Sequence, residues 1–202
     1  MRIQINMPKV IISFPHLFEK EPLNQWNKIE DMRQYVATFL LSKDNAKHVS
    51  VIDQIKDAEK KILAENGVRE NPYPTIKDGD IEHAKLPDGD DKSKLAKEKR
   101  SYLKGHWIIK AKSKFEVQLQ NKGYELDINV DANPFYAGCY VNAIFMMQPY
   151  PKGVSKFLKF VQFVEDGNAI GGGKIIASNY FERVDNSTVD AVAFEANDED
   201  LF

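Results

Sequence analysis

The sequence has a single cysteine and no long apolar run. Cys139, alone among 202 residues, cannot form an internal disulfide, which is compatible with a reducing cytoplasm. No stretch approaches the roughly 18 consecutive apolar residues of a membrane-spanning helix, so we expect no contact with a membrane. The first residues, MRIQINMPKVIISF, lack the apolar core and the small-residue cleavage site of a signal peptide, and we interpret them as mature sequence.

The usual signatures of catalysis and of metal or cofactor binding are also missing. The stretch GNAIGGGK (167–174) fails the phosphate-loop pattern, because Asn168 occupies the position of the first required glycine and Ile175 follows Lys174. The carboxylate-rich stretches DGD (78–80) and DGDD (88–91) are more typical of solvated loops than of a cation site. No nucleophile-elbow motif is present. Four scattered histidines with one cysteine form no zinc-binding spacing: His16, His48, His83 and His106. We therefore predict no catalytic residue, no metal and no cofactor.

Acidic residues are concentrated at the C-terminal end. Residues 185–202 hold six acids and no Lys or Arg, whereas the preceding residues hold 28 Lys and Arg against 24 Asp and Glu. The segment is polar and has no hydrophobic periodicity, which predicts a disordered acidic tail after a mildly basic domain over residues 1–184. Such an asymmetry is typical of a body that binds a polyanion and a tail that interacts with something else.

Short β-branched and aromatic segments, separated by Gly, Pro or Asn, predict a mainly β chain. The expected strands are 9–18, 33–43, 105–113, 123–130, 138–150 and 154–166. The last two are joined by Pro151-Lys152-Gly153, which predicts a hairpin. Five or six such strands suit a small closed or partly closed barrel.

One or two helices are expected between the early and the late strands. Ser50 is a candidate N-cap, and Gly67 occupies the position of a C-terminal glycine cap. The apolar face of this helix is formed by Ile52, Ile55, Ile62 and Leu63. Residues 70–95 are rich in Pro, Gly and Asp, which predicts a long loop, and the basic residues 92–104 can form a short helix.

The densest basic segment runs from Lys92 to Lys114, with nine Lys and Arg against one acid. Aromatic residues are interleaved with these cations: Tyr102, Trp107 and Phe115. Single-stranded nucleic acid is bound by cations that follow the phosphates and by rings on which bases stack. Lys110, Lys112 and Lys114 share one face of an extended strand, opposite Ile109 and Ala111. A solvated lysine-rich loop followed by a strand with core aromatics is the structural alternative.

A second group of rings and lysines lies in and next to the last two expected strands. It comprises Phe135, Tyr136, Tyr140, Tyr150, Lys152, Lys156, Phe157, Lys159 and Phe160. At strand spacing Phe157, Lys159, Val161 and Phe163 share a face, so some of these rings are expected in the core. The combined set of predicted nucleic-acid-binding residues is Trp107, Lys110, Lys112, Lys114, Tyr136, Tyr140, Lys156 and Lys159.

The acidic tail ends in a distinctive way. Its last residues, EANDEDLF, place an apolar pair and the terminal carboxylate behind a cluster of acids. This arrangement suits a basic-rimmed apolar pocket on a partner. The partner-binding candidates are Asp198, Glu199, Asp200, Leu201 and Phe202. The same acids could instead occupy the chain's own cationic groove in place of phosphates.

Several segments occur together in an order that resembles a known family. They are VIISFPHLF, YVATFLLSK, an amphipathic helix, DGD, YLKGHWIIKAKS, NPFYAGCYVNA and VEDGNAIGGGK. The chain resembles, over about residues 9–178, the tailed-phage single-stranded DNA-binding proteins, a family once catalogued as a domain of unknown function. Those proteins have an OB-fold core and are akin to the replication single-strand binders of T-odd phages. The most specific segments are SFPHLF and FYAGCYV with the downstream DGxxxGG.

The resemblance implies a fold and a role. The fold is mainly β with one or two helices: an OB-fold-like five-stranded barrel with an inserted helix, long loops and a disordered acidic C-terminal tail. The role is non-enzymatic: the chain coats and protects single-stranded DNA in phage replication and recombination, in the bacterial cytoplasm. The tail then recruits a replication or recombination protein, such as a polymerase, helicase or nuclease.

Two other functions remain open from the residues alone. A strand-annealing or recombination mediator would share the same binding surface. A small β-barrel hydrolase belongs to a different class and is disfavoured by the missing nucleophile motif, metal cluster and phosphate loop. Whether the chain is a monomer or a homodimer is also open.

Overall fold

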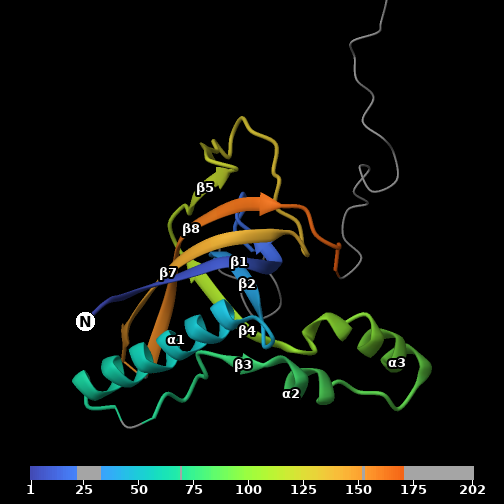
Figure 1. Ribbon diagram of the computed structural model, residues 1–202, viewed down its shortest axis with the longest axis horizontal. Helices are drawn as coiled ribbons and strands as arrows, with labels where there is room; N and C mark the ends of the chain where they lie inside the picture. Colours follow the sequence, from blue (N-terminus) through green and yellow to red (C-terminus); the bar gives the residue numbers. More distant parts are fainter. Residues whose placement is uncertain (22–32, 69, 152, 171–202) are drawn as a thin grey trace, which may run out of the picture.

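The computed structural model describes residues 1–21, 33–68, 70–151 and 153–170, and its centre is a five-stranded barrel (Figure 1). The barrel strands are β1 (Ile3–His16), β2 (Tyr35–Ser42), β4 (His106–Ser113), β7 (Tyr140–Tyr150) and β8 (Gly153–Glu165). They follow one another in the order β4-β2-β1-β7-β8 with antiparallel neighbours, and a parallel pairing of β4 with β8 closes the ring. A closed five-stranded barrel with this connectivity has the OB fold, which confirms the expected fold class.

The barrel encloses the hydrophobic core because apolar residues alternate along each strand. The fully buried side chains include Ala37, Phe39 and Leu41 of β2, Ile109 and Ala111 of β4, and Val141, Ala143 and Phe145 of β7. Strand β7 continues into β8 by a hairpin in which Tyr150 pairs with Gly153, as the sequence predicts.

Strand β8 contains a bulge that corrects one sequence prediction. Ile144 pairs with Phe160 and Phe145 with Leu158, so Lys159 is an extra residue on β8. The bulge reverses which residues face inward. The expectation that Phe157, Lys159, Val161 and Phe163 share a face is therefore wrong: Val161 and Phe163 are buried in the core, and Phe157 lies on the outside.

Short strands extend the sheet at both ends. Strand β3 (Lys77–Asp78) pairs with β4, and the hairpin of β5 (Gln118–Asn121) and β6 (Tyr124–Glu125) is added beside β8. The expected strand over 123–130 is wrong beyond Glu125. The Asp127 carboxylate accepts a hydrogen bond from the Asn129 amide, and the Asp127 carbonyl accepts one from Asp131, so these residues form a turn.

Helix α1 (Ala46–Glu65) packs its apolar face against β1, β7, β2 and β8. Its N-cap is Asn45, whose side chain accepts a hydrogen bond from the Lys47 amide, so the predicted N-cap at Ser50 is wrong by about one turn. Its C-terminus is as predicted. Gly67 has a left-handed φ of 64°, and the Val68 amide donates to the Leu63 carbonyl, which is the glycine-terminated helix end.

The segment between α1 and β4 carries two further short helices. They are α2 (Gly79–Ala84) and α3 (Asp91–Glu98), followed by a 3-10 turn, η2 (Ser101–Leu103). The prediction of a continuous loop over 70–95 is wrong at α2, which begins because the Asp78 carboxylate caps it. The short helix expected within 92–104 is confirmed by α3. None of the helices in the described ranges is long and apolar enough to cross a membrane.

Candidate nucleic-acid interface

The outward face of β2 and β4 carries a row of lysines. Lys110 lies opposite Thr38 and Lys112 opposite Val36, and both lysines are exposed, whereas Ile109 is fully buried on the other face. The predicted alternation along this strand is confirmed. Lys114 is also exposed but lies just beyond the end of β4.

Aromatic rings join this row from β8 and from the segment after β4. Lys112 is paired with Phe157 across the β4–β8 junction, so their side chains lie on the same face. The Lys159 ammonium lies 4.6 Å from the centre of the Phe157 ring. The centre of the Phe115 ring lies 6.3 Å from the centre of the Phe157 ring, and Phe115 is 72% exposed. We call Lys110, Lys112, Phe157 and Lys159 the basic strip. It combines cations for phosphates with a ring that can stack on a base.

A hollow of about 740 Å³ lies farther along the same outward face. It is lined by side chains from all five barrel strands: Ile11 of β1, Leu40 and Ser42 of β2, His106 of β4, Tyr140 of β7 and Glu165 of β8. Ser42 pairs with His106 on the same face as the Thr38–Lys110 pair, so β2 and β4 connect the hollow to the basic strip. The hollow thus combines the apolar side chains of Ile11 and Leu40 and one tyrosine ring with polar and charged groups, Asp44 and Glu165 included.

The rim of the hollow is formed by a bulge in β1. Lys9 has a left-handed φ of 45°, and its ammonium lies 5.7 Å from the centre of the Tyr140 ring and 2.9 Å from a Glu165 carboxylate oxygen. The Lys9 amide donates to Asn142 Oδ1 at 2.8 Å, which replaces the sheet hydrogen bond lost at the bulge. Tyr140, a predicted site residue, therefore lies in a defined setting next to a cation.

The His48 side chain hydrogen-bonds to the backbone of this bulge. Its Nδ1 accepts a hydrogen bond from the Ser42 amide at 3.0 Å, so the ring proton is on Nε2, which lies 3.2 Å from the carbonyl oxygens of Pro8 and Lys9. Burial lowers the pKa of His48, against the opposing effect of these two carbonyls. The neutral ring thereby joins β1, β2 and α1.

Side-chain amides form a chain on the outward face of β7, β8 and β5. Asn142 Nδ2 donates to Gln162 Oε1 at 2.8 Å, and Gln162 Nε2 donates to Gln120 Oε1 at 3.2 Å. We call Asn142, Gln162 and Gln120 the amide chain. These groups hydrogen-bond to one another, which satisfies them within the protein.

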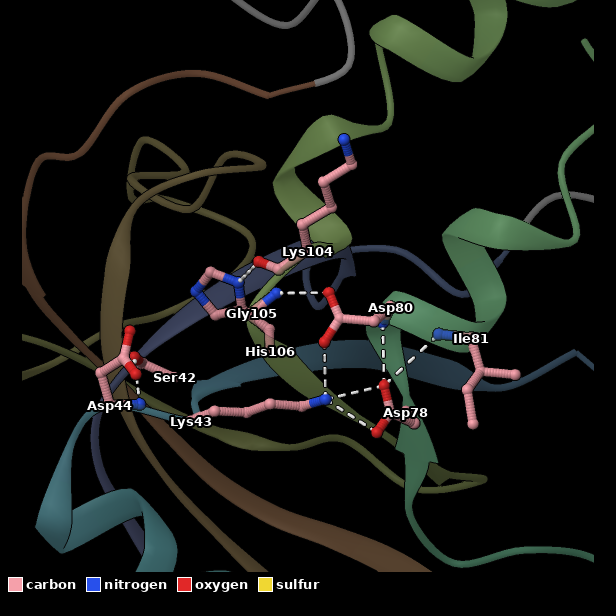
Figure 2. A network of polar contacts seen from close by, with 9 residues as sticks. All are labelled: Ser42, Lys43, Asp44, Asp78, Asp80, Ile81, Lys104, Gly105 and His106. Atoms are coloured by element: carbon pink, nitrogen blue, oxygen red, sulfur yellow. Dashed lines mark hydrogen bonds and ion pairs between the residues drawn. The ribbon is translucent and has the colours of Figure 1, made fainter.

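The DGD stretch binds a lysine of the barrel (Figure 2). The Lys43 ammonium lies 2.7 Å from both carboxylate oxygens of Asp78 and from Asp80 Oδ2, while Asp80 Oδ1 accepts from the Gly105 amide at 2.9 Å. These hydrogen bonds from Lys43 lower the pKa of both aspartates and raise that of Lys43. A Cβ on Gly79 would lie 2.0 Å from the Leu103 carbonyl oxygen, so only glycine fits. The stretch is thus a clamp that fixes the inserted segment to the ends of β2 and β4, rather than a solvated loop.

Of the eight predicted residues only Lys110, Lys112 and Lys159 belong to the basic strip, and two of the others, Trp107 and Lys156, lie on the opposite faces of their strands. Trp107 pairs with Leu41, on the opposite face of β4 from Lys110, and packs against the core beneath Lys43. Lys156 lies on the same face of β8 as buried Leu158, and burial lowers its pKa. The alternation of β4 already contained the signal for Trp107, since its odd position places it opposite the even-numbered lysines.

Tyr136 fastens two segments that are far apart in the sequence. Its hydroxyl donates toward Asp166 Oδ1 at 3.1 Å and the Gly167 carbonyl at 3.0 Å, and accepts from the Gly167 amide at 2.8 Å. Burial is the main reason that its pKa is raised to about 12. A Cβ on Gly138 would lie 2.0 Å from the Asn168 carbonyl oxygen. FYAGCYV and the start of DGxxxGG are therefore in direct contact.

The described part of the chain offers no strong nucleophile at its cysteine. Burial raises the pKa of the Cys139 thiol to about 11, so the thiol is protonated at neutral pH. No three His, Cys, Asp or Glu side chains within the described ranges are grouped as metal ligands would be. The tail candidates Asp198, Glu199, Asp200, Leu201 and Phe202, and the boundary at 184/185, lie outside the described residues.

The chain matches a family model and a curated relative. The family model described as "Enterobacter phage Enc34, ssDNA-binding protein" matches residues 3–192. A curated relative, protein p50 of Acyrthosiphon pisum secondary endosymbiont phage 1, is 30% identical over 188 residues, covering 90% of this chain and 93% of the relative.

Two solved structures share the fold. The single-stranded DNA-binding protein from bacteriophage Enc34, in complex with single-stranded DNA, is similar with a TM-score of 0.61 and 24% identity, covering 83% of this chain and 89% of that one. The single-stranded DNA-binding protein gp2.5 of bacteriophage T7 is similar with a TM-score of 0.52 and 12% identity, covering 92% and 98%.

Proposed function

Because the chain belongs to the family of the Enterobacter phage Enc34 single-stranded DNA-binding protein, we propose that it binds single-stranded DNA without regard to sequence. The observation that carries the proposal is the basic strip on the outward face of β4 and β8. The face of the second and third barrel strands is where OB folds bind oligonucleotides, and here β2 and β4 are those strands.

The chemistry of the strip suits an unpaired strand. Lys110, Lys112 and Lys159 are exposed and can bind successive phosphates. Phe157 lies between Lys112 and Lys159, and its ring can stack on any base because every base has a π-face. In the hollow, Tyr140 beside Lys9 repeats the same combination of ring and cation. Neither arrangement presents a fixed pattern of donors and acceptors to a base edge, so binding is independent of sequence.

Titration with oligo-dT tests this proposal. We expect binding at low salt, with an affinity that falls linearly with salt on logarithmic axes because bound lysines release counterions from the phosphates. A duplex of the same length serves as the comparison and should bind more weakly, since its bases are not free to stack. No binding to oligo-dT at low salt would overturn the proposal.

In the cell, the role that follows is coating and protecting single-stranded DNA during phage replication and recombination, in the host cytoplasm. The barrel domain, residues 1–184, would hold the DNA. The acidic residues 185–202, with Leu201 and Phe202 at their end, would recruit a replication or recombination protein. What supports this division is the charge difference between the two segments.

Removal of residues 185–202 tests the role of the tail. If its acids compete with DNA for the lysines, the shortened chain binds oligo-dT more tightly at low salt and equally at high salt, because screening removes the competition. An unchanged affinity at low salt would show that the tail does not compete.

A further inference from the structure

Phe14 combines two unfavourable features near the C-terminal end of β1. Its side chain is 61% exposed, and its backbone has a left-handed φ of 50°. Residues with a Cβ seldom adopt this conformation, and a residue that precedes proline, as Phe14 precedes Pro15, is favoured in extended backbone. Such a position persists only where the surrounding structure enforces it, and it is typical of functional sites.

The unusual backbone arises from a second bulge in β1. Ser13 pairs with Thr38, and the next pair is His16 with Val36, so Phe14 and Pro15 together lie opposite the single residue Ala37. Ala37 is fully buried, and regular strand geometry would direct one of these two residues into the core. The left-handed turn instead leaves the Phe14 ring in solvent.

The fold gains nothing visible from this ring. Phe14 is absent from the core cluster, and within the described ranges its ring makes no aromatic or cation–π contact. Phe18, four residues on in the same SFPHLF segment, lies 6.4 Å from the Phe135 ring. Packing therefore explains the second phenylalanine of the segment but not the first.

The position of Phe14 relates it to the basic strip. The Ser13–Thr38 pair continues to Lys110, and the His16–Val36 pair continues to Lys112 and Phe157. Neighbouring strands lie about 4.8 Å apart, so the β1 bulge is roughly 10 Å from the lysines of β4. An exposed ring thus stands across β2 from exposed cations.

We propose that Phe14 is a stacking platform for an unpaired base of the strand whose phosphates bind Lys110 and Lys112. This inference rests on the proposed function and assigns a role to the first phenylalanine of SFPHLF, which packing does not explain. The bulge turns the ring outward before DNA arrives, so little ordering remains to be done on binding. Stacking on one ring tolerates every base, which agrees with binding without regard to sequence.

The test compares F14L with F14W and the unmodified chain, using oligo-dT over a range of salt concentrations. We expect F14L to bind about 5- to 100-fold more weakly, with an unchanged salt dependence, because a stack is lost and no phosphate contact is. F14W should restore the affinity. Y124L is the matched control, since Tyr124 is 79% exposed on β6, away from the strip, and its loss should change nothing.

An oligonucleotide without bases sharpens the test. The unmodified chain and F14L should bind an abasic strand of the same length equally, because it offers nothing to stack. F14G separates binding from folding: glycine accepts the left-handed backbone, so this variant should unfold no earlier than the unmodified chain while losing affinity for oligo-dT.

The outcomes distinguish this inference from the proposed function. If the unmodified chain binds oligo-dT and F14L binds equally well, the role of Phe14 is wrong and the function stands. A loss of affinity that is the same on the abasic strand would also overturn it, since it would show a general change in the protein. If the unmodified chain does not bind, both proposals fail.

Discussion

The outward surface of the barrel has two regions that differ in whether their polar side chains have partners within the protein. On β4 and β8, Lys110 and Lys112 are exposed and form no ion pair with any residue that the structure describes. On β7, β8 and β5, the amide chain uses its donors and acceptors within the protein. Polar groups that bind one another stabilise a fold, whereas cations left without partners attract an anion. We therefore expect substitutions on β4 and β8 to change DNA binding and substitutions in the amide chain to change the stability of the fold.

The largest expected effect comes from reversing the charge of the strip. K110E/K112E should weaken oligo-dT binding on the order of 100-fold, because two phosphate contacts become repulsions. Its free energy of unfolding should stay within about 0.5 kcal/mol of the unmodified chain, as for most surface substitutions. Binding titrations and urea unfolding measure the two quantities.

K60E/K61E is the matched control for that charge reversal. Lys60 and Lys61 are exposed on α1, so the net charge changes equally at a distance from the strip. An equal loss of affinity in this control would contradict a localised interface and would indicate that only the total charge matters.

The second effect should appear in stability. Q162L removes the central link of the amide chain and leaves the half-buried amides of Asn142 and Gln120 without that partner. We expect the free energy of unfolding to fall by about 1–3 kcal/mol, with affinity for oligo-dT changed less than about twofold. Urea unfolding checks the first value. Q118L is the control, because Gln118 is the exposed residue of β5, and an equal loss there would contradict a special role for the amide chain.

The third effect concerns the boundary between the regions, where His48 holds the Lys9 bulge. Because burial lowers the pKa of His48, the unfolded chain takes up a proton at a higher pH than the folded chain. The stability that neutral His48 contributes is therefore complete above about pH 6.5, the ordinary histidine value, and is lost as the pH falls. Urea unfolding at pH 7.5 and pH 5.5 should show a smaller difference in H48Q than in H16Q. Equal differences would contradict this role.

The smallest effect is expected at the clamp. K43M removes the partner of Asp78 and Asp80, whose side chains are 34% and 51% exposed, so that solvent screens the ion pairs. We expect a slightly lower unfolding temperature at low salt and no difference at high salt, with DNA affinity preserved. A large loss of binding in K43M would show that the inserted segment belongs to the interface.

Much of the barrel is predictable because its signals are local. The alternation of buried and exposed residues from Ile109 to Lys112 can be predicted from the sequence of this strand alone. The end of α1 can be predicted from a single residue, Gly67. The site is less predictable because it depends on bulges. Neither Lys9 nor Phe14 belongs to a residue type that favours a left-handed backbone, and the extra residue Lys159 reverses the faces of β8 without a glycine to mark it. The clamp joins Lys43 to residues 35 and more positions away, which no local pattern reveals.

The barrel is closed by a single residue pair, Lys112 with Phe157, and this pair also lies in the basic strip. β8 is the last barrel strand to leave the ribosome, so a growing chain can pair β4 with β2 but lacks β8 on the other side of β4 until about residue 165 has emerged. A chain that stops earlier keeps an open edge on β4 and has no complete strip. During synthesis, the proposed ability to bind DNA therefore arises only at the step that also completes the barrel. Shortened chains would not compete with the full-length protein for DNA.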